Sequence, residues 1–546
     1  MAINPGYSAI RGRPCSLGDL LAKVREFGVD DWILHLSRLA TLLAGSRHRP
    51  GQYGDAFFTY LVPEDDIRFR SWFKMVSSKG AKPFLFTDRH VGILIELALL
   101  HAPRDPTKKI PPGGHVLDAL LMLVDLETPE QLPQTDAAWA VFMATIGQRS
   151  RLVEAVACAT RGYFLYQIGR DNKSSSALEW SRLFGEATKS QLDAYFIGGL
   201  LALGVTVLKK PQEIAGIVEP LPSAPATDAD HLMHGVPDAY YALRSASIEA
   251  IANETRRWEK NPNPVEFNLI ALRKKPLYVK NGAGPYTLFL SGLADSLCEG
   301  VYQEIITASV GDQVSESVQD VGSLFGYLFE EYVLELLEEV FPRERLLKRP
   351  RRKDNGREGA DAIILYPEGL IVLQIKGRHV PGTDRYAWKS EADLDEVIRR
   401  TGLVEAVEQF VERDSIRSCR KGLVEGLSFR DCALIPIQPL AVTYESVPFE
   451  GLPIPKMRDL RERVRLDPYT RPLVAVDVQE IEALCSLPSS DTVWRVLAQY
   501  ITSPEGQPRP IRNFLHDTGK LLDTAIDARW ERTLASVIRQ LKPEPR

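Results

Sequence analysis

The stretch GADAIILYPEGLIVLQIKG, residues 359–377, contains two runs of strand-forming apolar residues separated by the turn sequence YPEG at 366–369. Proline at the second position of a turn and glycine at the fourth are typical of type I, so the stretch predicts a β-hairpin. Three polar residues interrupt the apolar runs: Asp361, Gln374 and Lys376. Any assignment of function has to explain why these residues stand in otherwise apolar strands.

The register of the predicted hairpin brings the three polar residues together. Counting outward from a symmetric turn places Asp361 opposite Gln374, and directly opposed Cβ atoms lie roughly 4.5–5.5 Å apart. Lys376 shares a face with Gln374 because strand side chains alternate with a period of two. The same count places Gly359 opposite Lys376, where it would leave room beside the ammonium group. Both faces of the hairpin are otherwise apolar, so we expect the sheet to be covered on both sides.

An aspartate and a lysine in this position have two explanations. Isolated charges are costly away from water, so Asp361 and Lys376 should pair with each other or with a metal ion. A salt bridge without a catalytic role is the simpler explanation. The other is phosphodiester hydrolysis, since carboxylate and amide oxygens bind Mg²⁺ and a lysine stabilises the charge that develops on an attacked phosphate.

These residues resemble the motif of a known family. Asp361 on the first strand and Gln374-Ile375-Lys376 on the second are similar to the PD-(D/E)xK, or restriction-endonuclease-like, nucleases over residues 320–450. The resemblance implies an α/β restriction-endonuclease-like domain, a mixed sheet flanked by helices, that hydrolyses phosphodiester bonds in DNA with Mg²⁺ or Mn²⁺. It further implies a role in prokaryotic genome defence or DNA repair, and RNA is not excluded as the substrate.

Gln374 departs from the commonest form of this family, which has glutamate two positions before the lysine. An amide oxygen still binds a metal ion, but the site loses one negative charge and should bind the ion less tightly. A second metal ion is therefore not expected. A catalytically inactive domain that binds nucleic acid without cutting it is an alternative.

The family also carries a glutamate on the helix before the first strand, and the segment 322–341 predicts such a helix. Its apolar stripe on a helical wheel consists of Phe325, Phe329, Val333, Leu336 and Val340. Glu330 lies at the border of this stripe, whereas Glu331 is expected to point to solvent. Gly326, one turn before Glu330, would let the helix approach the sheet closely. The resemblance therefore implies a catalytic set of Asp361, Gln374, Lys376 and Glu330, of which Glu330, Asp361 and Gln374 would bind the metal ion.

The segment FPRERLLKRPRRKDNGREG, residues 341–359, is strongly basic. Such a segment neutralises backbone phosphates and positions a duplex without reading its sequence. A solvated charge run is the alternative explanation. The predicted nucleic-acid contacts are Lys348, Arg349, Arg351, Arg352, Lys353 and Arg357. Glu358 and Gln409 are accessory candidates for the site, and His379 is expected to be a loop residue.

The composition is that of an ordinary globular protein. Of 546 residues, 44% are hydrophobic and 25% charged, and the formal net charge of −5 argues against nucleic-acid binding through overall positive charge. Six cysteines lie far apart without a CxxC pair, which favours a reducing, cytoplasmic location. The longest uncharged run, residues 194–208, is shorter than the roughly 18–20 residues of a membrane span. We therefore predict a buried helix there and no membrane association.

The order of patterns along the chain predicts three parts. Residues 1–270 form a mainly helical region of unknown role, residues 271–490 the nuclease domain and residues 491–546 a C-terminal helical extension. The expected elements are strands at 361–366, 370–376, 431–445 and 472–477, and helices at 391–412 and 519–541. No GxxxxGK[ST] loop is present, so unwinding or moving DNA would need partner proteins of a defence or repair system. A scaffold that binds proteins through residues 1–270 is a further alternative.

Overall fold

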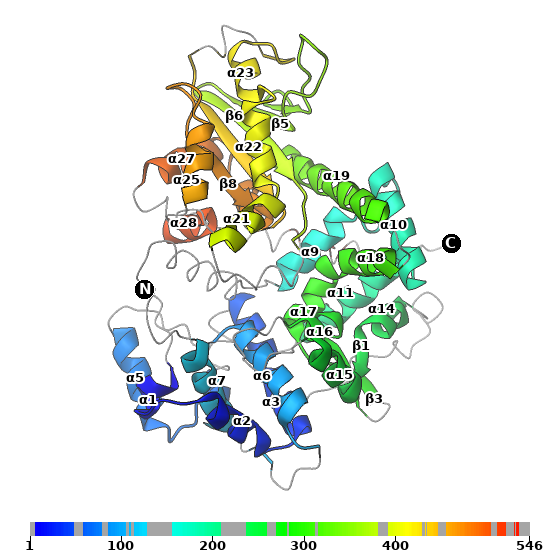
Figure 1. Cartoon of the computed structure of the whole chain (residues 1–546), viewed down its shortest axis with the longest axis vertical. Helices are drawn as coiled ribbons and strands as arrows, with labels where there is room; N and C mark the ends of the chain where they lie inside the picture. The colour runs from blue at the N-terminus through cyan, green and yellow to red at the C-terminus, as the bar shows by residue number, and fades with distance from the viewer. Residues whose placement is uncertain are drawn as a thin grey trace.

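The protein, described by a computed structural model, is a mixed α/β chain in which helices flank two β-sheets (Figure 1). In Figure 1 the helix-rich N-terminal half fills the lower part of the molecule and the larger sheet the upper part. The structure describes residues 6–48, 58–78, 86–104, 109–110, 114–127, 155–208, 236–258, 269–280, 283–311, 315–380, 391–427, 432, 434–445, 455–503, 510–519, 529, 531–533 and 535.

Helices make up the N-terminal part of the chain. They are α1 (Tyr7–Arg11), α2 (Leu17–Arg25), α3 (Val29–His48), α5 (Ile67–Ser78), α6 (Asp88–His101) and α7 (Gly114–Glu127). Helix α2 begins with a capping box, in which the Ser16 hydroxyl accepts the Asp19 N–H and the Asp19 carboxylate accepts the Ser16 N–H. The apolar faces of these helices share one core, to which Trp32, Leu94 and Leu120 belong. The helical prediction for this part is confirmed over the described residues.

The chain from α9 to α18 contains a second group of helices and a small sheet that was not predicted from the sequence. The helices are α9 (Ala155–Leu165), α10 (Ser175–Thr188), α11 (Leu192–Leu208), α14 (Val236–Arg244), α15 (Ile248–Trp258), α16 (Ile270–Lys274), α17 (Leu290–Ser296) and α18 (Glu299–Gly311). The strands are β1 (Ser245–Ser247), β2 (Leu277–Lys280) and β3 (Ala283–Thr287), with β2 in the middle. Helix α11 contains the long uncharged run and is buried, as predicted, around Phe196, Leu200 and Leu203. None of the described helices combines the length and apolar character needed to cross a membrane.

The packed cores do not separate at residue 270. Leu272 and Phe289 pack into the core of the N-terminal helices. Leu293 of α17 belongs to a second core, which continues to Leu373 of the larger sheet. Segments on both sides of residue 270 therefore stabilise one another, and the three-part division of the chain stays a prediction.

The larger sheet has five strands in the order in which they occur along the chain. They are β4 (Leu346–Lys348), β5 (Ala362–Tyr366), β6 (Gly369–Lys376), β7 (Ile437–Thr443) and β8 (Val474–Asp477). Strands β4, β5 and β6 are antiparallel neighbours, whereas β6, β7 and β8 run parallel to one another. Parallel neighbours need crossover connections, and these carry helices of the domain. Strands β7 and β8 lie within the predicted segments and are shorter.

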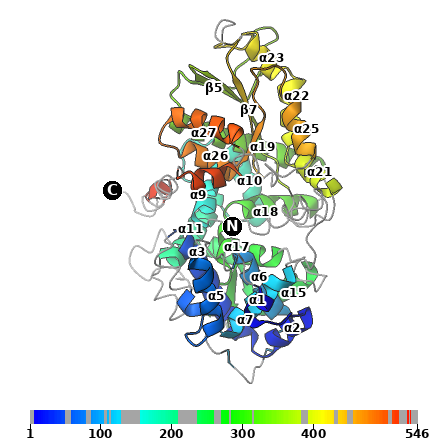
Figure 2. The same ribbon diagram turned by 90° about the vertical axis from the view of Figure 1, so that its left-hand side faces the viewer.

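Helices cover both faces of this sheet, as predicted from the apolar hairpin. One face packs against α19 (Ser315–Val340), α26 (Val478–Cys485), α27 (Ser490–Thr502) and α28 (Ile511–Asp517). The other face packs against α21 (Glu391–Arg400), α22 (Leu403–Val411), α23 (Ser415–Arg420) and α25 (Pro455–Arg463). Figure 2 shows α22 and α25 on one side of the strands and α26 and α27 on the other. The predicted helix at 519–541 lies almost wholly outside the described residues.

The hairpin of β5 and β6 has the predicted register. Ala362 pairs with Leu373 in the last pair of the ladder, and Asp361 directly precedes β5. The Asp361 N–H donates at 3.2 Å to the carbonyl of Leu373, which already faces Ala362, so the predicted Asp361–Gln374 pair does not continue the ladder. No bulge shifts the pairing between the turn and Ala362, so the alternation of faces counted from the sequence holds over β5 and β6.

The helix predicted at 391–412 is two helices. Gly402 has a φ of 86°, which is a left-handed conformation that favours glycine, and it ends the run between α21 and α22. A Cβ at Gly402 would lie 2.8 Å from Lys376 Cβ. The prediction that Gly359 lies beside Lys376 was wrong, because a Cβ at Gly359 would instead meet the Pro350 carbonyl and Val424, each at 3.4 Å.

Candidate active site at the end of the β5–β6 hairpin

Asp361 is fixed by both neighbouring strands. Its N–H donates to Leu373 O, and its own carbonyl accepts the Arg349 N–H at 2.9 Å. The carboxylate turns back to the second strand of the hairpin, where Oδ2 accepts the Ile375 N–H at 2.5 Å. Lys376 Nζ lies 3.8 Å from the same oxygen. The structure therefore brings Asp361 and Lys376 together at one end of the hairpin.

Burial dominates the electrostatics of Asp361. Removal of the carboxyl group from water raises its pKa from the ordinary 3.8 to about 6, although the Lys376 charge and the Ile375 N–H lower it. The negative charges of Glu330 and of the exposed Glu358 raise this pKa further. Lys376 is confined too, since its side chain is 11% exposed and its ammonium group donates to the Ile375 carbonyl at 3.2 Å. A divalent cation at this position would favour the ionised carboxylate.

Gln374 offers an oxygen on the same face of the sheet. Its side chain is buried, and Nε2 donates to Ser415 Oγ at 3.3 Å. Oε1 is buried and has no hydrogen-bond partner among the described residues. An unpaired amide oxygen in the interior costs about 1–3 kcal/mol, so this atom suits a ligand that the described residues do not supply. The oxygens of Asp361 and Gln374 are hard donors, which fit Mg²⁺ or Mn²⁺.

Glu330 reaches the border of the site from α19. The apolar stripe of this helix is buried, with Phe325, Phe329, Val333 and Leu336 against the core. The Glu330 side chain is 18% exposed, and its Oε1 accepts a hydrogen bond from Arg349 Nε at 2.5 Å. Its charge acts on the pKa of Asp361, so the two carboxylates are within electrostatic reach. Glu330 would contact a metal ion only after giving up part of its ion pair with Arg349.

Helix α19 touches the end of β6 close to Glu330. A Cβ at Gly377 would lie 2.8 Å from Gly326 Cα and 2.7 Å from Phe329 Cβ, whereas a Cβ at Gly326 would meet nothing within 4 Å. The predicted close approach of helix and sheet occurs at this point. Gly377, rather than Gly326, is the glycine that permits it.

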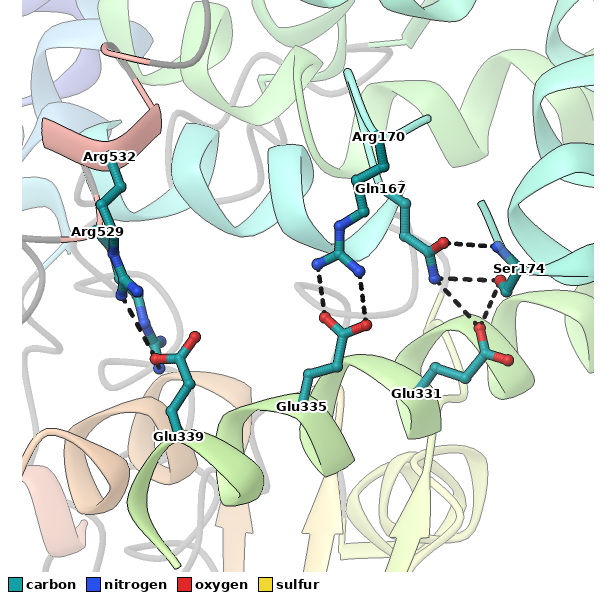
Figure 3. A network of polar contacts seen from close by, with 8 residues as sticks. All are labelled: Gln167, Arg170, Ser174, Glu331, Glu335, Glu339, Arg529 and Arg532. Atoms are coloured by element: carbon teal, nitrogen blue, oxygen red, sulfur yellow. Dashed lines mark hydrogen bonds and ion pairs between the residues drawn. The ribbon is translucent and has the colours of Figure 1, made fainter. Parts of the chain in front are cut away.

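The opposite face of α19 is covered by other parts of the chain. Glu331 Oε2 accepts hydrogen bonds from Ser174 Oγ at 2.7 Å and from Gln167 Nε2 at 3.4 Å, so its predicted solvent position was wrong. The following turns form ion pairs at 2.7–3.4 Å, Glu335 with Arg170 and Glu339 with Arg529 and Arg532 (Figure 3). Helix α19 is therefore packed between the sheet and these other segments of the chain. This packing fixes the helix that carries Glu330.

The structure distinguishes the six basic residues predicted to contact nucleic acid. Three form ion pairs: Lys348 with Glu338, Arg349 with Glu330 and Arg352 with Asp354. The Lys353 ammonium group donates to the carbonyls of Gly422 and Leu427 at 2.9 and 2.6 Å. Arg351 and Arg357 are exposed, and within the described part of the chain no carboxylate pairs with either. These two arginines are the most available to an incoming phosphate.

Ser415 was not singled out from the sequence, yet it connects two candidate residues. Its hydroxyl donates to the Gln409 carbonyl at 2.9 Å and accepts from Gln374 Nε2. Gln409 Oε1 is a second buried amide oxygen without a partner among the described residues. No sequence signal marks Ser415, because only the packing of α22 and α23 on β6 brings it there. The break between helices α21 and α22, in contrast, could have been predicted from the sequence, because glycine readily adopts the left-handed conformation that ends a helix.

The chain was compared with known families, curated proteins and solved structures. No family model matches it, and neither the curated proteins nor the solved structures yield a match. The function of the site must therefore be argued from its own geometry and from the short motif at Asp361, Gln374 and Lys376.

Proposed function

We propose that this chain is a metal-dependent nuclease with a restriction-endonuclease-like domain, and that it hydrolyses phosphodiester bonds in DNA. The observation that carries the proposal is the contact of Asp361 with Lys376 at one end of a buried hairpin, with the unpaired Gln374 oxygen two residues before Lys376 on the same strand. A mixed sheet covered on both faces and preceded by a helix that carries Glu330 is compatible with that fold. The motif extends the proposal to genome defence or DNA repair in a prokaryote.

Each residue has a defined part in the proposed reaction. Asp361 and Gln374 would hold the ion, with Glu330 at its border. The chemistry that a bound Mg²⁺ or Mn²⁺ supplies is neutralisation of phosphate charge and activation of water. Lys376 Nζ, 3.8 Å from Asp361 Oδ2, is placed to donate to the oxygen on which negative charge develops. The Ile375 N–H holds the Asp361 carboxylate in the orientation that faces Lys376.

The charges of the site favour joint binding of metal and substrate. The carboxylates of Asp361 and Glu330 stand beside two cations, Lys376 and Arg349. These four charges sum to zero, so a divalent ion alone gains little net attraction. A DNA phosphate would add negative charge and would give the Arg349 guanidinium an alternative partner. Metal affinity is therefore expected to rise when DNA is bound.

One observation favours a second function. Arg349 already neutralises Glu330, and Gln374 contributes no charge to the site. A domain with these two features could grip nucleic acid through Arg351 and Arg357 without cutting it. DNA binding that is unaffected by Lys376→Ala, together with no cleavage by any preparation, would favour this second function.

Plasmid cleavage tests the proposal. Wild-type protein, Lys376→Ala and the matched control Lys421→Ala are incubated with supercoiled DNA and Mg²⁺ or Mn²⁺, after melting curves have shown that all three fold. Lys421 lies in the same domain and is exposed, and its side chain forms no hydrogen bond or ion pair with another described residue. We expect nicking that requires the metal ion, survives in Lys421→Ala and is lost in Lys376→Ala. Cutting that survives in Lys376→Ala would refute the site and leave Asp361 and Lys376 as a structural salt bridge.

A further inference from the structure

A cavity of about 600 Å³ lies between helices α14 to α18 and the loop that follows β6. Cavities of this size accommodate small ligands. The basic residues in its wall are already engaged with the chain: Arg244 with Glu304, Arg273 with Asp295, Lys274 with Glu254 and Lys275 with the Leu243 carbonyl. The wall is therefore not a surface of surplus positive charge for a large anion.

Two carboxylates and an imidazole converge beside this cavity, and two of the three residues, Glu299 and His379, line it. Glu299 is the first residue of α18, His379 follows β6, and Glu445 lies just beyond β7. One ligand atom from each of the three residues lies within 4.8 Å of the other two, and His379 Nε2 is 3.9 Å from Glu445 Oε1. The side chains of His379 and Glu445 are 2% and 4% exposed. A nearby positive charge stabilises a carboxylate as buried as that of Glu445, and a metal ion held by these three ligand atoms would add such a charge.

The surrounding residues hold the imidazole and one carboxylate in place. The His379 ring stacks on Tyr302 with 4.4 Å between ring centroids and 14° between planes. The Val380 N–H donates to Glu445 Oε1 at 3.3 Å. Burial and the Glu445 charge raise the pKa of Tyr302 to about 12, so its phenol stays neutral. Contacts of this kind orient the ligands of a metal ion before it arrives.

An independent feature indicates that the cavity receives a ligand. Arg244 is buried in the cavity wall, and its Nη2 has no hydrogen-bond partner among the described residues. A Cβ at Gly300 would lie 3.0 Å from this nitrogen, so the glycine after Glu299 allows the guanidinium group to pack against the start of α18. An unpaired buried guanidinium nitrogen needs an oxygen acceptor, which the described residues do not supply. A metal ion at the neighbouring carboxylates, with water or a small anion on its open side, would supply one.

We propose that Glu299, His379 and Glu445 form a site for a divalent transition-metal ion whose open side faces the cavity. One nitrogen and two oxygen donors favour Mn²⁺ or Zn²⁺ over Mg²⁺, which prefers oxygen alone. The site shares no residue with Asp361, Gln374 and Glu330, so it goes beyond the proposed nuclease function. Either proposal can fail without the other.

Mn²⁺ binding to the metal-free full chain tests the site. Free Mn²⁺ is followed by electron paramagnetic resonance, and pulsed measurements report ¹⁴N coupled to the bound ion. Of the two proposed sites, the cavity site has an imidazole ligand and the hairpin site has oxygen donors alone, so the ¹⁴N signal distinguishes them. We expect this signal in wild-type protein and in Asp361→Asn. In His379→Gln the signal should vanish and the affinity of this site should fall at least about 10-fold.

Melting curves provide the control for folding. Mn²⁺ should raise the Tm of Asp361→Asn but not that of the double variant Asp361→Asn, His379→Gln, in which both sites have lost a ligand. If His379→Gln fails to fold, Glu299→Gln at the start of α18 replaces it and should likewise lose the ion and its ¹⁴N coupling. Bound Mn²⁺ without ¹⁴N coupling, or equal binding by wild type and His379→Gln, would overturn the proposal and leave His379 and Glu445 as a buried ion pair.

Discussion

Gly377 at the end of β6 touches Gly326 of α19, and a Cβ on Gly377 would lie 2.8 Å from Gly326 Cα. This contact determines how closely the helix crosses the sheet. Glu330 lies one turn further along α19 and Lys376 directly precedes Gly377. The distance between the helix and the sheet at this point therefore controls how Glu330 stands relative to the hairpin residues.

Gly377→Ala should damage both stability and activity. The new methyl group would clash with the α19 backbone and with Phe329 Cβ, neither of which can rotate away, so α19 must shift. We expect a loss of about 1–3 kcal/mol in the free energy of unfolding, measured with urea, and weaker cleavage. Gly326→Ala is the matched control, since its methyl group would meet nothing within 4 Å. It should be neutral or stabilising by about 0.5–1 kcal/mol, and equal losses in both variants would contradict the contact.

The raised pKa of Asp361 predicts a pH-dependent stability. Between about pH 4 and 6 the folded chain holds a proton on Asp361 that the unfolded chain has released. The contribution of the Asp361 carboxyl group to the free energy of unfolding is therefore fully present below about pH 4. It is lost as the pH rises through 6, and the loss is at most about 3 kcal/mol.

Asp361→Asn isolates this effect because it removes the titrating group. Urea unfolding of wild type and variant at a series of pH values should show the variant gaining relative stability as the pH rises from 4 to 6. Mg²⁺ above pH 6 should stabilise the wild-type protein and leave the variant unchanged, since the ion needs the ionised carboxylate. A stability difference that does not vary with pH would show that the carboxyl group titrates at its ordinary value.

The hairpin and its polar face could be predicted from the sequence because they depend on local rules. A short turn fixes the register, and the period of two then fixes which side chains share a face. Asp361, Gln374 and Lys376 follow from these two facts. The cover on both faces of the sheet follows from the continuous apolar runs 362–365 and 370–373, which place apolar side chains on both faces.

The remaining features depend on contacts between distant segments, which periodicity does not specify. Glu331 was expected in solvent because a helical wheel shows one helix, whereas the structure packs Ser174 against it. The position of Gly359 was predicted wrongly because the pairing of β5 with β6 ends at Ala362, before Gly359 is reached. The cluster at His379 could not be found from spacing, because its partners Glu299 and Glu445 come from other elements.

Arg349→Gln should strengthen metal binding at the hairpin. The change removes the cation that neutralises Glu330, so the site gains one net negative charge. The ion pair is partly exposed, and pairs of this kind contribute at most about 1 kcal/mol, so Mn²⁺ affinity should rise about 2-fold to 5-fold. The measurement is an Mn²⁺ titration without DNA, in the His379→Gln background so that the cavity site does not contribute. Arg345→Gln, which breaks a pair with Asp491, is the matched control and should leave the affinity unchanged.

The exposed arginines after β4 should determine how DNA binding depends on salt. If Arg351 and Arg357 each neutralise one phosphate, their joint replacement by Gln removes two released counterions. The slope of log K against log salt should then become shallower by about 1.8. The control is the double variant Arg182→Gln, Arg257→Gln. It changes the net charge by the same amount, on exposed helices far along the chain from β4. An equal change of slope in both pairs would show that DNA responds to overall charge and would remove the segment beside Asp361 from the nucleic-acid interface.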